Sequence, residues 1–210
     1  MIAIIDYGAG NLTSVKLAFE RIGASVTVTS DPNEIANAER VVFPGVGSAG
    51  SGMAAFCERG LDLAFRDALA NGKPTLAICL GMQMLFESST EDGGVEALGI
   101  LPGTVELFEF PVKSHLKVPH MGWNSVSFSQ THPMMAGIRP NEAFYFVHSY
   151  FVAATTPCVV IGSTEYGNFE FTSIAGRKNL FATQFHPERS GAAGLQLLKN
   201  FLTWDGSLCY

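Results

Sequence analysis

The chain has 210 residues, of which 47% are hydrophobic and 15% charged, so its composition excludes a disordered protein. We expect one domain that covers residues 1–210. The net charge of −6 is spread along the chain without a cluster of Lys and Arg, which argues against a nucleic-acid partner. A carboxylate as early as Asp6 and the short apolar runs argue against a signal peptide and a membrane span, and predict a cytoplasmic protein.

The first half of the chain alternates short apolar runs with helical patterns, which is typical of a parallel sheet covered by helices. Strands are predicted at residues 2–6, 25–29, 40–43 and 75–78, and helices at residues 14–22 and about 52–70. The first helix is followed by Gly23, which supplies a stop. Its apolar face, which should pack on the sheet, consists of Val15, Ala18, Phe19 and Ile22.

The second half is a succession of strand-like runs with little helical pattern between them. Strands are predicted at residues 144–153, 158–163, 171–175 and 180–185. A closing helix is predicted at residues 192–202, with Ser190 as its N-cap and helical spacing at Leu195, Leu198, Lys199 and Leu202. We therefore predict an α/β, three-layer fold: a mostly parallel central sheet with helices on both faces, and a smaller antiparallel sheet in the second half.

Cys79 lies where a predicted strand meets a helical pattern. Ala77 and Gly81, two positions before and after it, allow the sharp turn of a nucleophile elbow. The following helix would direct backbone amides and its positive dipole end at the sulfur, which stabilises a thiolate. Burial as a small apolar side chain is the commoner role of a lone cysteine, and we expect it for Cys57 and Cys158. The cysteine spacing indicates no metal site, and we expect no cofactor.

His186 is the histidine best placed to act as the base for Cys79. It ends an apolar run, where a further parallel or mixed strand would bring it beside the cysteine. Pro187 restricts it to an extended backbone, so Glu188 should point to the same side and orient the imidazole. A strand-end histidine beside a solvated glutamate is the alternative. Of the other histidines, His115 and His132 are expected at the surface, His120 follows a proline, and His148 lies in a strand run.

An oxyanion formed by attack on an amide needs two hydrogen-bond donors. The amide of Leu80 is one candidate, and the turn Gly45-Val46-Gly47 after the neighbouring strand could supply the other. This turn also begins a G-x-G-x-x-G pattern that ends at Gly50. A dinucleotide fingerprint should follow the first strand, with an acidic residue about 20 residues on, so we consider that alternative weak.

The segment from Cys79 to Gln83 and the later sequence His186-Pro187-Glu188 are together the two signatures of triad-type class I glutamine amidotransferases. The chain resembles this family over essentially its whole length. The resemblance implies the family's fold, a Cys79 thioester formed from glutamine, His186 as general base and then acid, and Glu188 orienting His186. It implies oxyanion donors at Val46, Gly47 and Leu80, and glutamine-binding residues at Gln83, Glu91, Ser149 and Tyr150.

Further stretches resemble those members of the family that deliver ammonia to a (β/α)₈-barrel synthase of histidine biosynthesis: residues 5–12, 44–47, 119–124 and 145–150. The resemblance implies an interface with that synthase formed by Met121, Trp123, Asn124, Tyr145 and Arg189. From the residues alone, Met121 and Trp123 could equally belong to a loop core. Arg189 stands where many relatives have lysine, so the detailed contact there differs in geometry. The resemblance also implies low activity of the free chain, with the turn around Val46 holding its donor in the wrong direction.

Three other functions compete with this interpretation. A different glutaminase of the same class, such as one feeding pyridoxal phosphate synthesis or a γ-glutamyl hydrolase, fits the opening at residues 7–11 less well. Many stress-protein and peptidase relatives have a histidine directly after the cysteine, where this chain has Leu80. A catalytically inactive docking subunit would not need the intact set of Cys79, His186 and Glu188.

Overall fold

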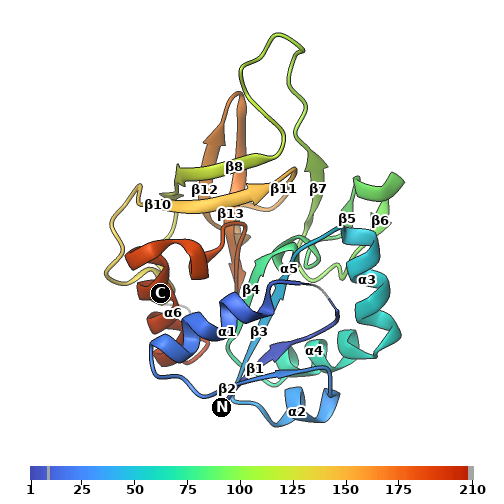
Figure 1. The fold of residues 1–210 in the computed structure, drawn as a ribbon, viewed down its shortest axis with the longest axis vertical. Helices are drawn as coiled ribbons and strands as arrows, with labels where there is room; N and C mark the ends of the chain where they lie inside the picture. The colour runs from blue at the N-terminus through green and yellow to red at the C-terminus, as the bar shows by residue number, and fades with distance from the viewer. Residues whose placement is uncertain (9, 208–210) are drawn as a thin grey trace.

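The computed structural model describes residues 1–8 and 10–207 (Figure 1). Ala9, within the motif at residues 5–12, and Cys209 lie outside the described residues. The strands are β1 Ile2–Ile5, β2 Val26–Thr29, β3 Arg40–Gly45, β4 Thr75–Cys79, β5 Ser88–Ser89, β6 Val95–Glu96, β7 Gly103–Leu107, β8 His120–Ser125, β9 Ser127–Phe128, β10 Ala143–His148, β11 Tyr150–Ala154, β12 Val160–Tyr166, β13 Phe169–Arg177 and β14 Leu180–Thr183. The α-helices are α1 Leu12–Arg21, α2 Pro32–Asn37, α3 Ala49–Glu58, α4 Leu61–Ala70, α5 Leu80–Gln83 and α6 Gly191–Thr203.

The central sheet has a parallel part and an antiparallel part. Its order β2-β1-β3-β4-β14 is parallel throughout, with Thr183 of β14 paired to Ile78 of β4. All residues of β1, β4 and β14 are buried, because helices cover both faces of this part of the sheet. The carboxyl ends of β3, β4 and β14 therefore meet at one edge, and this edge carries the candidate site.

Helices cover the sheet on both sides (Figure 1). Helices α1 and α6 enclose one core, in which the rings of Phe19 and Phe201 lie 5.9 Å apart. Helices α2, α3 and α4 enclose the other, around the stacked rings of Phe43 and Phe56 at 4.6 Å. The predicted three-layer α/β class is confirmed.

The antiparallel strands of the second half mainly extend the same sheet, in the order β14-β13-β11-β7. A separate small antiparallel sheet is formed by β8 and β10, which we call the β8–β10 ribbon. Trp123 of β8 pairs with Tyr145 of β10 in its middle. In Figure 1 the ribbon lies near the top of the molecule, where the connection from β7 to β8 extends outward.

Several predicted elements differ in detail. The helix expected at residues 52–70 is two helices separated at Gly60, whose φ of 65° is a left-handed conformation that favours glycine. The strand expected at residues 144–153 is divided at Ser149 into β10 and β11. The helix α2 was not predicted, although Asp31 caps it by accepting a hydrogen bond from the Asn33 amide at 2.8 Å.

The closing helix predicted at residues 192–202 is present as α6, but its buried face differs in part from the prediction. Its buried face consists of Gly194, Leu197, Leu198 and Phe201, whereas Leu195 and Leu202 are half-buried and Lys199 is exposed. Ser190 is the N-cap residue of α6, as predicted, but its side chain makes no capping hydrogen bond. Its hydroxyl instead donates to the carbonyl of His186 at 2.6 Å and accepts from the amide of Tyr145 at 3.0 Å. Ser190 thereby ties the His186 turn to the β8–β10 ribbon.

Across residues 1–8 and 10–207, no helix combines the length and hydropathy needed to cross a bilayer.

Candidate active site

Cys79 occupies a strained elbow between β4 and α5. Its φ of 55° and ψ of −109° are unusual for a residue with a Cβ atom, and such strain is held in place by the surrounding structure. A Cβ atom added to Gly81 would lie 2.0 Å from the carbonyl oxygen of Phe43, so the helix can follow the sheet this closely because residue 81 is glycine. The predicted elbow is therefore present at the carboxyl end of β4.

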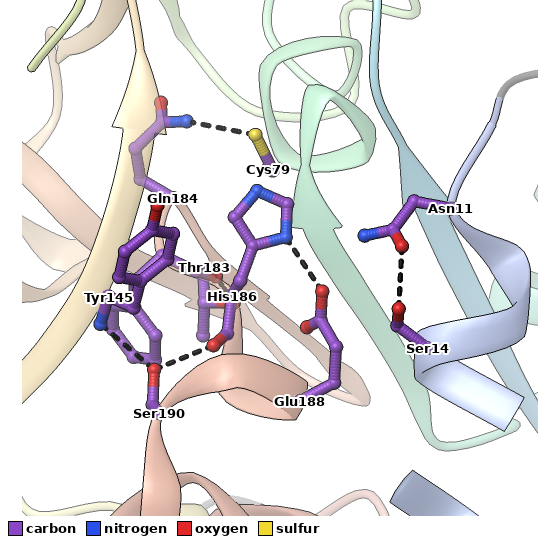
Figure 2. Close-up of polar contacts among 10 residues, drawn as sticks. Asn11, Ser14, Cys79, Tyr145, Thr183, Gln184, His186, Glu188 and Ser190 are labelled. Carbon is purple, nitrogen blue, oxygen red and sulfur yellow. Dashed lines mark hydrogen bonds and ion pairs between the residues drawn. The ribbon is translucent and has the colours of Figure 1, made fainter. Parts of the chain in front are cut away.

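His186 is brought to Cys79 by β14, the parallel neighbour of β4. Its Nδ1 lies 2.8 Å from Oε1 of Glu188, and the two side chains are 3% and 0% exposed (Figure 2). Glu188 reaches the imidazole from the 3₁₀ turn Pro187–Arg189 rather than from the extended continuation that the sequence predicted. The turn, and not strand alternation, is the reason that the contact forms.

The imidazole of His186 lies between the sulfur and the carboxylate, with Nε2 directed at Cys79 (Figure 2). Among the described residues, Nε2 of His186 and Oε2 of Glu188 have no hydrogen-bond partner. Burial lowers the pKa of His186, but the charges of Cys79 and Glu188 outweigh it and raise the pKa to about 10. The site therefore favours the protonated imidazolium form of His186.

A pocket of about 340 Å³ opens beside the sulfur. Seven of the sequence-predicted residues line it together with Cys79: Val46, Gly47, Leu80, Gln83, Glu91, Ser149 and Tyr150. The pocket is also lined by Pro119, which directly precedes β8, and by Val147 and His148 at the end of β10. Residues far apart in sequence thus form one pocket beside the sulfur of Cys79.

The candidate oxyanion groups lie on two neighbouring strand ends. Leu80 is the first residue of α5, so its amide is one of the free donors of a helix N-terminus. Gly45 pairs with Cys79 across β3 and β4, and Gly47 two residues later has a φ of 108°. Tyr7 packs against this turn so closely that a Cβ on Gly45 would lie 1.9 Å from its hydroxyl. Burial, and then the charge of Cys79, raises the pKa of Tyr7.

Glu91 is held at the edge of the pocket by the N-terminus of α3. Its Oε2 accepts a hydrogen bond from the Ala49 amide at 2.7 Å. Burial raises the pKa of Glu91, the Ala49 amide opposes this shift, and Asp92 adds to it. A carboxylate at this place can receive a cationic group of a ligand in the pocket.

Several residues do not lie where the sequence predicted. His132 is buried, between the rings of Phe181 at 4.8 Å and Trp204 at 5.2 Å, and burial lowers its pKa to about 4. The expected surface position was wrong because the residues after β9 fold back under α6. Cys57 and Cys158 are exposed rather than buried. Within the described part of the chain, no group of three or more His, Cys, Asp or Glu side chains is arranged to hold a metal ion.

Sequence reasoning assigned no role to Gln184. This side chain is fully buried, and its Nε2 donates to Sγ of Cys79 at 3.7 Å (Figure 2). The only available signal was its place two residues before His186, where β14 approaches β4.

Four of the predicted interface residues lie on the β8–β10 ribbon, and Arg189 lies beside it on the turn Pro187–Arg189. Met121 is 62% and Trp123 58% exposed, so both are surface residues of a strand and not part of a loop core. The ring of Tyr145 lies 6.2 Å from that of Trp123, and the guanidinium of Arg189 lies 4.4 Å above it. Asn124 has its side chain on the other face of β8, where its amide donates to the carbonyl of Glu165 at 2.9 Å.

The elbow, the histidine and the carboxylate define a thiol amidotransferase site, and the family model described as glutamine amidotransferase class-I matches residues 3–204. The chain therefore belongs to the class I glutamine amidotransferase family. It is similar over nearly its whole length to two proteins named imidazole glycerol phosphate synthase subunit HisH. That of Acinetobacter baylyi is 52% identical over 205 residues, covering 97% of this chain and 98% of the relative. That of Aromatoleum aromaticum is 52% identical over 210 residues, with the same two coverages.

A solved structure described as the crystal structure of glutamine amidotransferase matches with a TM-score of 0.74. The match has 17% sequence identity and covers 98% of this chain and 100% of that one, so it supports the fold alone. The family resemblance and the predicted fold class are confirmed.

Proposed function

We propose that this chain is the cytoplasmic glutaminase subunit of an imidazole glycerol phosphate synthase in histidine biosynthesis. The observation that carries the proposal is the arrangement of Cys79, His186 and Glu188 at one edge of the parallel sheet, with the sulfur opening on a pocket. The two relatives at 52% identity support the choice of synthase over other glutaminases of the class.

The reaction follows from the positions of the three side chains. The Cys79 thiolate attacks the amide carbonyl of glutamine, and His186 protonates the nitrogen through Nε2, so ammonia leaves and a thioester remains. His186, now neutral, removes a proton from water as it attacks the thioester. Glutamate departs and the thiolate is restored. Glu188 keeps the proton on Nδ1 and stabilises the imidazolium.

The remaining pocket residues divide into two groups. Leu80 and the Val46–Gly47 turn would supply the oxyanion donors, since they flank the sulfur from adjacent strand ends. Gln83, Glu91, Ser149 and Tyr150 would hold the glutamine, with Glu91 receiving its α-ammonium group.

The partner would be a (β/α)₈-barrel synthase subunit that docks on the β8–β10 ribbon. Met121, Trp123 and Tyr145 form an outward apolar face there, with Arg189 stacked on the tyrosine. The same ribbon ends in Val147 and His148, which line the pocket, so a partner on this face would lie next to the place where ammonia forms. The complex would use the ammonia to make imidazole glycerol phosphate and aminoimidazole carboxamide ribotide.

Activation by the partner would act on the oxyanion turn. Val46 lies between Gly45 and Gly47, and a peptide between glycines can turn over at low cost. If the productive orientation is a minority in the free chain, the rate falls in proportion to its population. We therefore expect the free chain to be a poor glutaminase.

The test measures glutamate release by the chain alone, and then with the barrel synthase and its ribonucleotide ligand. We expect a low basal rate that rises strongly only in the complex. Cys79→Ala should lose synthesis from glutamine but keep synthesis from added ammonia. Unchanged glutamine-dependent synthesis in Cys79→Ala would show a docking subunit instead, and strong activity of the free chain would contradict the gated turn.

A further inference from the structure

Gln184 is a buried polar side chain beside Cys79, and the reaction described above assigns it no role. It lies one residue beyond the pair formed by Thr183 and Ile78, so it faces Cys79 from the neighbouring strand. Its Nε2 is 3.7 Å from Sγ, within the range of hydrogen bonds to sulfur. An amide N–H is a useful partner for a thiolate, because the sulfur of a neutral thiol is only a weak acceptor.

The orientation of the Gln184 amide follows from its neighbours. The carbonyl of Tyr150 can only accept, so the side-chain atom of Gln83 at 2.8 Å from it must be the NH₂ group. The second hydrogen of that NH₂ group points to the Gln184 side chain at 3.1 Å, where the acceptor must be Oε1. The NH₂ group of Gln184 is then left facing Cys79.

A second chain of donors fixes the Tyr150 carbonyl from the other side. His148 donates to it from Nδ1 at 2.8 Å, which leaves Nε2 of the neutral ring as an acceptor. The atom 3.0 Å from this Nε2 is Nδ1 of His120, which therefore carries a proton. Both histidines are buried among aromatic rings of the β8–β10 ribbon and the adjoining sheet. Each hydrogen bond in this series, which runs from His120 to the sulfur of Cys79, therefore has only one possible donor.

We propose that Gln184 is a catalytic hydrogen-bond donor that stabilises the Cys79 thiolate, and that Gln83 and His148 are positioning residues that hold its amide in this orientation. The catalytic role of Gln184 rests on the proposed glutaminase function, but its hydrogen bond to the Cys79 sulfur does not. Gln83 thus holds the Gln184 amide in addition to making its proposed contact with glutamine. His186 and Tyr7 also face the sulfur, and neither is altered in the variants below.

The test is the pH dependence of Cys79 alkylation by iodoacetamide in the full chain, followed by mass spectrometry of each cysteine peptide. Gln184→Met keeps the length of the side chain and removes the donor. We expect its pH midpoint at Cys79 to rise by about one unit, which corresponds to a roughly tenfold loss of thiolate stabilisation. Gln83→Met leaves Gln184 in place but frees its amide, and should give a smaller rise. The exposed Cys57 and Cys158 are internal controls whose midpoints should not move.

Thr183→Val is the matched variant, because it removes a buried hydroxyl next to Gln184 that donates to the carbonyl of Phe185 at 2.9 Å. It should leave the Cys79 midpoint unchanged even if it lowers the melting temperature. In the complex with the barrel synthase, Gln184→Met should lower kcat for glutamine about tenfold while KM stays within about twofold. A wild-type Cys79 midpoint in folded Gln184→Met would overturn the proposal. If the Cys79 midpoint shifts in Gln184→Met but the unmodified chain never hydrolyses glutamine, the hydrogen bond from Gln184 is supported and the proposed function is rejected.

Discussion

The parallel strands and the β8–β10 ribbon both reach the pocket, but they differ in what covers them. The strands β4 and β14 are buried on both faces, and they place Cys79 and His186 at adjacent ends. The ribbon has one face buried against aromatic rings and one face exposed, where Met121 and Trp123 lie. Rigid burial on both faces suits the chemistry, whereas a one-sided ribbon can meet a partner while its inner face touches the pocket.

The largest effect should come from the parallel part, at Glu188. Glu188→Gln can offer its NH₂ group to Nδ1 of His186 and so favour the wrong tautomer. We expect kcat of glutamine hydrolysis in the complex to fall by about 10³- to 10⁴-fold. Glu142→Gln, which removes a surface carboxylate paired with Arg139 at 3.0 Å, is the control and should retain activity. A loss below tenfold in Glu188→Gln would mean that the carboxylate does not orient the histidine.

The elbow should be the most sensitive place for stability. Gly81→Ala puts a methyl group where the Phe43 carbonyl oxygen lies 2.0 Å away, and backbone cannot move aside as a side chain can. We expect a loss of about 3 kcal/mol in the free energy of unfolding, measured in urea. A Cβ on Gly10 would meet its nearest neighbour, the Val46 side chain, at 3.5 Å, so Gly10→Ala should cost far less. Equal losses in the two variants would contradict the packing argument.

On the ribbon, the exposed Trp123 should matter for association and not for folding. Trp123→Ala should weaken binding of the barrel synthase by about 10- to 100-fold, measured by titration calorimetry. Its melting temperature should stay near that of the unmodified chain because the ring is 58% exposed. Leu63→Ala, at a similarly exposed apolar side chain of α4, should leave affinity unchanged. Equal affinity of Trp123→Ala and the unmodified chain would place the partner elsewhere.

The inner face of the ribbon should be sensitive to acid. Burial lowers the pKa of His120 to about 4 and that of His148 to about 3, below the unfolded value of about 6.5. Their contribution is present above pH 6.5 and is lost as the pH falls toward these folded pKa values. Protonation of each histidine should lower the free energy of unfolding by up to about 1.4 kcal/mol for each pH unit in that window.

His132, in the core under α6, has a similarly lowered pKa and allows the two regions to be compared. His132→Phe should remove the part of the pH dependence of the unfolding free energy between pH 6.5 and 4 that comes from His132. The part that comes from His120 and His148 should remain. Unfolding curves in urea at several pH values give the slopes. An acid slope that vanishes in His132→Phe would show that the His120–His148 pair contributes nothing.

The chain order of strands and helices in the first half could be predicted because continuous apolar runs and helical spacing are local signals. The elbow at Cys79 was also readable, since small residues on both sides are needed for a sharp turn. The buried face of α6 was misjudged because Leu195 and Leu202 fit helical spacing as well as Leu197 and Phe201 do. Spacing defines a face, but which face meets the sheet depends on its neighbours.

The amino-acid sequence alone indicated Cys79, His186 and Glu188 as the candidate catalytic residues, because they stand in short motifs with proline or glycine beside them. What surrounds these residues depends on how distant parts of the chain pack together. The pairing of β14 with β4 brings Gln184 to the sulfur of Cys79, and the pairing of β8 with β10 brings Nδ1 of His120 to Nε2 of His148. These two contacts join residues 105 and 28 positions apart, so no local pattern in the sequence could indicate them.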